Sequence, residues 1–130
     1  MTAFSSLLTD FRASAPNYEI EIDENWKQGR TAYGGLTAAL LHAAIVNSYD
    51  NLPPLRTAQI NFVGPTDGRM RVTHKTLRRG KNNVTFEARL DSDAGPALTA
   101  ILHSASAVRW PGKWIIQNMN CQSARKWAKN

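Results

Sequence analysis

Two adjacent glycines, Gly34 and Gly35, open a run that extends to Tyr49 without a charged side chain. If this run is a helix, its first backbone N–H groups have no partner inside it, and the helix dipole adds positive potential beside them. Glycine also lets another molecule approach the backbone closely. Such amides can hold a carbonyl oxygen that becomes negative during attack, as reactions at an acyl carbon require. The same glycines would equally suit a tight turn packed against a sheet.

Attack on an acyl carbon also needs an activated water molecule. Three polar residues share one face of a short alternating segment, and they are the predicted water-orienting group: Thr57, Gln59 and Asn61. Amides can orient a water molecule but cannot take its proton, so this set implies slow hydrolysis or a base from another subunit. If the strand is buried, the same groups could instead pair with the backbone.

Proton acceptors are present but scattered. The candidates are His42, His74, His103, Asp10, Asp23 and Asp67. His42 lies in the middle of the uncharged run, where a single histidine is typical of a satisfied core or interface group. We expect His74 and His103 to point inward from strands. No acidic residue lies close to Gly34, so the base is the weakest part of the predicted site.

Other reaction types have little support in the sequence. A Gly-x-Ser-x-Gly motif is absent, and the single cysteine, Cys121, has no evident partner. One cysteine and three dispersed histidines do not give zinc-ligand spacing. We therefore expect no metal and no cofactor.

Basic residues predict an anionic ligand. The formal net charge is +6, and one turn concentrates basic and amide side chains: Arg78, Arg79, Lys81 and Asn82. This turn can supply charge and hydrogen-bond donors to phosphates, or it can simply be a solvated turn. Nucleic acid is disfavoured as the partner, because aromatic and basic residues are not interleaved along the strands.

The elements that position these groups can be read from periodicity. The uncharged run predicts a helix enclosed by protein, and Pro53-Pro54 prevents its continuation. Residues 1–13 predict a short amphipathic helix. The remaining patterns alternate and are separated by glycine- and asparagine-rich turns, which favours antiparallel strands. The expected strands are 18–23, 57–63, 69–77, 84–90 and 97–108. Together they predict an α+β fold in which about five or six strands wrap round one long helix.

At 130 residues the chain has room for one domain. We place that domain at residues 1–110 and expect a C-terminal extension, 111–130, to contain a short helix. No segment is long and apolar enough to span a membrane, and no secretory signal is visible. A cytoplasmic location is the default expectation for such a chain.

From Trp26 to Ala107 the sequence resembles the N-terminal repeat of the acyl-CoA thioesterase II family, whose members carry two hotdog repeats in one chain. The resemblance is carried by four segments in order: Ala32–Gly35, Thr57–Pro65, Thr76–Asn82 and Ala100–Ala105. It implies a hotdog fold and an acyl-CoA ligand, with CoA as part of the substrate. The predicted acyl slot lies between helix and sheet and is lined by Leu36, Leu40, Phe62 and Phe86, each of which could equally be a plain core residue. Tyr33 is a further expected substrate-binding residue.

The resemblance also shows what the chain lacks. In that family the catalytic carboxylate, with a Thr or Ser and a Gln, belongs to the second repeat, and here Tyr33-Gly34-Gly35 stands where the Asp would be. We expect a second copy to complete the site, which predicts a homodimer or higher homo-oligomer. The leading hypothesis is an acyl-CoA thioester hydrolase that uses direct water attack. The alternative is a non-catalytic hotdog that binds acyl-CoA or a partner protein.

Overall fold

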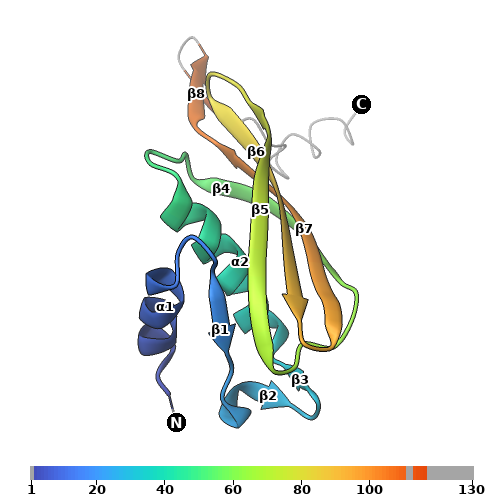
Figure 1. Ribbon diagram of the computed structural model, residues 1–130. Coiled ribbons are helices and arrows are strands. Elements are labelled where there is room, and N and C mark those ends of the chain that lie inside the picture. Colours follow the sequence, from blue (N-terminus) through green and yellow to red (C-terminus); the bar gives the residue numbers. More distant parts are fainter. Residues whose placement is uncertain (1, 111–112, 117–130) are drawn as a thin grey trace.

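Helix α2, Gly34–Ser48, is the centre of the structure, and it was predicted to within one residue. The computed structural model describes residues 2–110 and 113–116. Almost half of α2 is buried, at Leu36, Thr37, Leu40, Leu41, Ala43, Ala44 and Ile45. Such a wide apolar surface must pack on a broad partner. An antiparallel sheet of five strands provides it (Figure 1).

The sheet has the strand order β1-β5-β6-β7-β4, and all of its neighbouring strands are antiparallel. The strands are β1 Glu19–Glu21, β4 Leu55–Phe62, β5 Arg69–Arg79, β6 Asn83–Ser92 and β7 Gly95–Ala105. The predicted alternation of β6 is confirmed, because Val84, Phe86, Ala88 and Leu90 are all buried. The α+β class and the single central helix are therefore as predicted.

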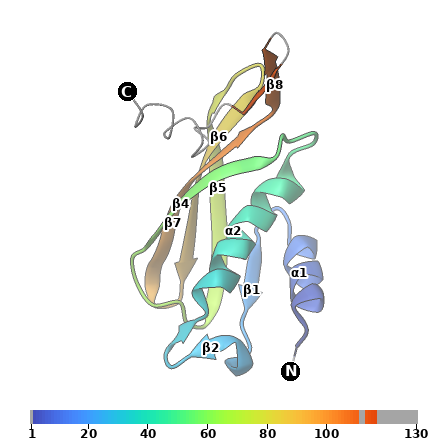
Figure 2. The ribbon, with the colours of Figure 1, turned by 180° about the vertical axis from the view of Figure 1, so that it is seen from behind.

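The sheet covers only one side of α2. Helix α1, Phe4–Ala13, packs beside α2 and β1 and buries Leu7 and Phe11 (Figure 2). One stripe of α2 stays partly or fully exposed, at Gly35, Ala38, His42 and Val46. These residues are three or four positions apart and so share one face of the helix. The expectation that protein encloses α2 on all sides is therefore wrong within one chain, because one sheet face and one short helix cannot cover it.

The start of α2 is held by a segment that the periodicity did not predict. A short 3₁₀ helix, η1 Glu24–Trp26, is followed by a hairpin of β2 Lys27–Gln28 and β3 Thr31–Ala32. The Ala32 N–H donates to the Thr66 carbonyl at 2.9 Å, and the Tyr33 N–H donates to the Trp26 carbonyl at 2.8 Å. These bonds fix the chain at the point where α2 begins.

Beyond the main sheet, β8 Ala107–Trp110 pairs with β9 Lys113–Ile116 as a separate antiparallel hairpin. The predicted strand 97–108 is thus divided at Ser106, between β7 and β8. Residues 113–116 of the expected C-terminal extension are extended, so the short helix expected in it does not lie there. The rest of that extension lies outside the described residues.

Packing of α2 on the sheet predicts the cost of truncating its core. Leu40 is fully buried and Leu77, on β5, is half exposed. We expect Leu40→Ala to lower the free energy of unfolding by about 2–5 kcal/mol, since it removes buried methyl groups and leaves a cavity. Leu77→Ala deletes the same atoms from a solvated position and should cost much less. Urea unfolding of both variants measures this, and equal losses would contradict the described core.

Candidate functional site

The first turn of α2 presents two backbone donors to solvent. The N–H groups of Leu36 and Thr37 both reach the Tyr33 carbonyl, at 3.0 Å and 3.2 Å. Among the described residues, none accepts from the N–H of Gly34 or Gly35. Tyr33 provides no side-chain cap, and the first turn has no acidic residue. The predicted pair of free amides is therefore present, and the helix dipole reinforces it.

Two aromatic rings flank these amides. A Cβ built on Gly34 would lie 3.0 Å from Cε1 of Phe62, and one built on Gly35 would lie 2.6 Å from Cε1 of Tyr33. Each glycine therefore leaves room for a ring that a side chain would displace. Tyr33 is 49% exposed and Phe62 is 62% exposed, although both are large and apolar. The two exposed rings therefore form an apolar surface beside the polar amides of Gly34 and Gly35.

Polar contacts hold the first turn of α2 and the neighbouring hairpin in place. The fully buried Thr37 hydroxyl donates to the Gly34 carbonyl at 2.9 Å. In strand β2, Lys27 Nζ lies 2.7 Å from Asp67 Oδ1 and 2.6 Å from Glu24 Oε1. The hydrogen bond from Lys27 lowers the pKa of Asp67, and a bond from the Gly68 N–H adds to this. Asp67 is therefore a fixed carboxylate, poorly suited to accept a proton from water.

The structure does not bring the polar residues of β4 to this turn. Phe62 contacts Gly34 and pairs with buried Leu98, so Phe62, Ile60 and Ala58 share the face that carries α2. Thr57, Gln59 and Asn61 therefore point to the opposite face, and all three are exposed. The expectation that they lie in a buried strand is wrong, because β4 is the edge of the sheet.

The predicted acyl slot is mostly closed. Leu36, Leu40 and Phe86 are packed core residues, and only Phe62 is open. A pocket of about 390 Å³ lies further along α2, between the helix, the 51–55 segment and the sheet. Its lining includes His42, Val46, Tyr49, Leu52, Phe86 and Leu102. The open stripe of α2 leads from Gly35 past Ala38 to this pocket, roughly two helical turns away.

The basic turn lies far from the start of α2 within one chain. Arg78 and Arg79 end β5, and Lys81 and Asn82 lie in the turn that leads to β6. Figures 1 and 2 place this turn at the opposite end of the sheet from the β2–β3 hairpin and the first turn of α2. One subunit therefore does not combine this turn and the two free amides in a single compact site.

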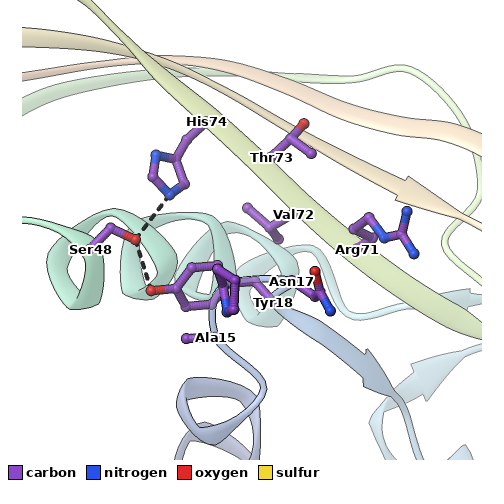
Figure 3. A pocket seen from close by; sticks show the side chains of 9 residues that line it. Ala15, Asn17, Tyr18, Ser48, Arg71, Val72, Thr73 and His74 are labelled. Atoms are coloured by element: carbon purple, nitrogen blue, oxygen red, sulfur yellow. Dashed lines mark hydrogen bonds between the residues drawn. The ribbon is translucent and has the colours of Figure 1, made fainter.

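A second polar cluster, which the sequence did not predict, lies at the other end of α2. Ser48 Oγ is 3.0 Å from His74 Nε2 and 2.8 Å from the Tyr18 hydroxyl (Figure 3). The Tyr49 hydroxyl lies 3.5 Å from His74 Nδ1, and the Asn47 amide donates to Tyr18 at 3.0 Å. The cluster ties the end of α2 to β5 and to the segment before β1.

One assignment of the protons satisfies all of these contacts. The Ser48 hydroxyl donates to the Ala44 carbonyl at 2.7 Å, so its oxygen accepts from His74 Nε2–H. Nδ1 is then the acceptor for the Tyr49 hydroxyl. The Ser48 proton is therefore not directed at His74, and the pair is not arranged as a nucleophile and its base. It is a neutral network that holds the helix on the sheet.

His103 also differs from expectation. It pairs with Thr57 and its Nδ1 lies 2.9 Å from the Thr85 hydroxyl, so it is on the outer face of the sheet rather than inside. His74 does face α2, as predicted for an inward strand residue. Its partner Ser48 is 26 residues away in the sequence. No spacing pattern in the sequence reveals such a contact.

Sheet order and helix placement define the hotdog class of α+β proteins. The chain belongs to the family described as acyl-CoA thioesterase N-terminal domain, whose model matches residues 22–105. The matched range includes α2, β4, β5, β6 and β7. A search of curated protein sequences finds no match.

Solved structures support the fold. A putative thioesterase II from Thermobifida fusca YX is 22% identical with a TM-score of 0.68, over 92% of this chain and 44% of that one. A hot dog protein of unknown function from Alicyclobacillus acidocaldarius is 15% identical with a TM-score of 0.68, over 87% and 43%. The BH2602 protein from Bacillus halodurans, solved with CoA, is 18% identical with a TM-score of 0.58, over 77% and 89%. The chain thus spans less than half of the first two proteins and most of the third.

Among the described residues, no group of three or more His, Cys, Asp or Glu side chains is arranged to hold a metal ion. Within the same ranges, no helix is long and apolar enough to cross a membrane.

Burial of His74 predicts a pH dependence of stability. Burial lowers the pKa of His74 below its ordinary value of 6.5, and its neighbours Tyr18, Ser48, Tyr49 and Thr76 carry no charge. Below pH 6.5 the unfolded chain therefore binds a proton that the folded chain resists. The free energy of unfolding should rise with pH through the window that ends near this value.

The measurement is denaturant unfolding of the wild type and of His74→Gln across that window. Glutamine can keep a hydrogen bond to Ser48 but does not titrate, so the variant should show a smaller rise with pH. Identical slopes for the two proteins would show that His74 does not cause the dependence.

Proposed function

We propose that this chain binds acyl-CoA thioesters with the thioester carbonyl at the Gly34 and Gly35 amides. The observation that carries the proposal is the pair of unpartnered N–H groups at the start of an uncharged helix, flanked by exposed Tyr33 and Phe62. Family membership supports an acyl-CoA ligand. The B. halodurans protein of the same fold was solved with CoA.

In this proposal the acyl chain follows the open stripe of α2. Ala38 is small enough to let a chain pass close to the helix, and the pocket beyond His42 is about 390 Å³. Its lining is mainly apolar, which suits a hydrocarbon tail. The carbonyl would remain at the helix start, where the amides stabilise the negative charge that develops when water attacks.

Hydrolysis in this proposal takes its base from a second hotdog domain. The first turn of α2 has no acidic residue, and Asp67 is engaged by Lys27. A direct water attack needs a proton acceptor within hydrogen-bond reach of the water. Without that acceptor the chain would bind acyl-CoA but not cleave it, and this is the second candidate function. The absence of an acidic residue from the first turn of α2 favours this non-catalytic function.

We further propose that the second domain lies alongside β4, as in a homodimer. One edge of β4 pairs with β7 and the other is open among the described strands. Phe62 and Val63 next to this edge are largely exposed, and Val46 on the open stripe of α2 is nearly half exposed. Antiparallel pairing of two β4 strands would form a continuous sheet, since edge strands readily pair with each other.

Such a dimer would also reposition the basic turn. A two-fold axis normal to the sheet reverses the partner end for end, so the partner's turn and this chain's α2 start would lie at the same end. Arg78, Arg79, Lys81 and Asn82 of one subunit could then face the phosphates of CoA bound mainly to the other. This arrangement accounts for a turn that is remote within one chain.

The site proposal is tested by Gly35→Ala. The added methyl group requires Tyr33 to move, but that ring is half exposed, so the fold should persist. We expect acyl-CoA binding, measured by calorimetry, to weaken by about tenfold or more as the amide becomes obstructed. Ser5→Ala, at the first turn of α1, is the control and should bind normally.

Thiol release from a panel of acyl-CoAs, from acetyl to dodecanoyl, separates the two candidate functions. Turnover that falls in Gly35→Ala supports hydrolysis at this site. Binding without turnover supports the non-catalytic function. Absence of both, in a folded protein, would overturn the site itself.

The dimer is tested by introducing a charged residue on each face of β4 in turn. Ala58 faces the α2 side and its neighbour Thr57 faces away, and both are exposed in one chain. Ala58→Glu would bury a charge in the proposed interface and should give a monomer in sedimentation velocity. Thr57→Glu adds the same charge to the solvated face and should remain dimeric. If both variants keep the wild-type oligomeric state, pairing along β4 is contradicted.

A further inference from the structure

A second open edge lies on the other side of the sheet. Strand β1 is only three residues long and pairs with β5 only from Arg69 to Arg71. One more bond follows, from the Val72 N–H to the Tyr18 carbonyl at 3.0 Å. Strand β5 continues to Arg79, and among the described strands nothing pairs with residues 73–79 on that side. More than half of β5 is therefore an edge strand.

The pairing of β5 with β1 determines the direction in which the free backbone groups of β5 point. The Val72 N–H points toward β1, and N–H and C=O groups alternate sides along an antiparallel strand. His74 and Thr76 therefore direct their N–H and C=O groups to the open edge. The regular pairing of β5 with β6 is interrupted only after Thr76. This leaves a short, regular stretch that can accept one more strand.

A pocket marks the start of this open stretch. It has a volume of about 710 Å³ and lies where β1 begins, against Asn17, Tyr18, Ser48, Val72 and His74 (Figure 3). An added strand would place alternate side chains on the α2 side of the sheet. The first of these side chains would enter the pocket, so the edge offers a site for a side chain as well as backbone partners.

The charges along β5 indicate the kind of strand. Arg71 pairs with Glu19, and Lys75 Nζ lies 3.4 Å from Glu87 Oε2. Arg78, Arg79 and Lys81 follow at the end of the edge, and no described acidic side chain pairs with them. Excess positive charge at this end favours an acidic partner. A second copy would place like charges opposite each other across the ladder, which is unfavourable.

We propose that β5 residues 73–79 bind an extended, acidic peptide segment of another protein, which adds to the sheet as a strand. Backbone bonds to His74 and Thr76 would supply affinity. The pocket beside Tyr18 and the basic end at Arg78 and Arg79 would supply selectivity. This surface is at the opposite edge of the sheet from β4 and shares only the basic turn with the proposed CoA site, so its backbone bonds at His74 and Thr76 go beyond that site.

The probe is a fluorescein-labelled heptapeptide, Glu-Val-Glu-Thr-Glu-Val-Glu, and its control replaces every Glu by Lys. We expect anisotropy titrations to show binding of the acidic peptide only. Hydrogen exchange should show protection of the His74 and Thr76 amides in the complex. Equal binding of both peptides, binding of neither, or protection elsewhere would overturn the proposal. So would binding of a single-stranded oligonucleotide at this edge when the peptide fails to bind.

Variants of the chain test the edge directly. Thr76→Pro removes one edge donor without removing a bond to β6, and proline is tolerated at such positions. It should weaken peptide binding by about tenfold. The double variant Arg78→Glu/Arg79→Glu should weaken peptide binding to a similar extent. Arg12→Glu, on exposed α1, should have little effect on binding. Unchanged affinity in the two edge variants would overturn the proposal.

A change in the peptide tests the same bonds with the protein left intact. N-methylation of alternate peptide residues blocks the donors on one edge of the added strand. One of the two methylated registers should lose binding and the other should keep it. Equal affinity of both registers would overturn strand addition even if Thr76→Pro fails to fold.

Discussion

Helix α2 is held on the sheet by apolar contact, and the rest of the structure depends on that contact. Leu40, Leu41 and Ala44 are fully buried, yet α2 has no acidic residue in its first turn and no basic residue in its last turn. Such a helix gains little from solvent or from capping charges, so its stability comes from the surface it covers. Removing the sheet would remove the helix.

That contact also determines what the ends of α2 can do. The neutral network around His74 fixes the last turn to β5, and the bonds from Ala32 and Tyr33 fix the first. With both ends held, the amides of Gly34 and Gly35 stay at a constant position beside Phe62 and Tyr33. Preorganised donors of this kind stabilise developing charge without reorganisation. The one-sided cover also leaves the helix open toward β4, which is where the proposed second domain would lie and supply the base.

Much of the fold could be predicted from the sequence, because periodicity records which side of an element is buried. The alternation of Val84 to Leu90 and the uncharged run from Gly34 each have a single good interpretation. The sequence of β4 has no single interpretation. Gln59 and Asn61 alternate with Ile60 and Phe62, and this pattern does not reveal that the strand lies at the edge of the sheet. The Ser48–His74 contact joins residues distant in the chain, and only the fold brings them together. The unpartnered amides of the proposed site could therefore be predicted, whereas the positions of the predicted polar side chains could not.

The unequal lengths of β1 and β5 have a consequence for solubility. The described sheet has two different open edges, along β4 and along the end of β5. If β4 of one molecule met β5 of the next, the contact would repeat without closing, and the product would be a growing filament. The basic end of β5 and the irregular pairing after Thr76 oppose this, because charge and bulges discourage strand stacking. Neutralising Arg78 and Arg79 would therefore favour fibrous aggregation at high concentration.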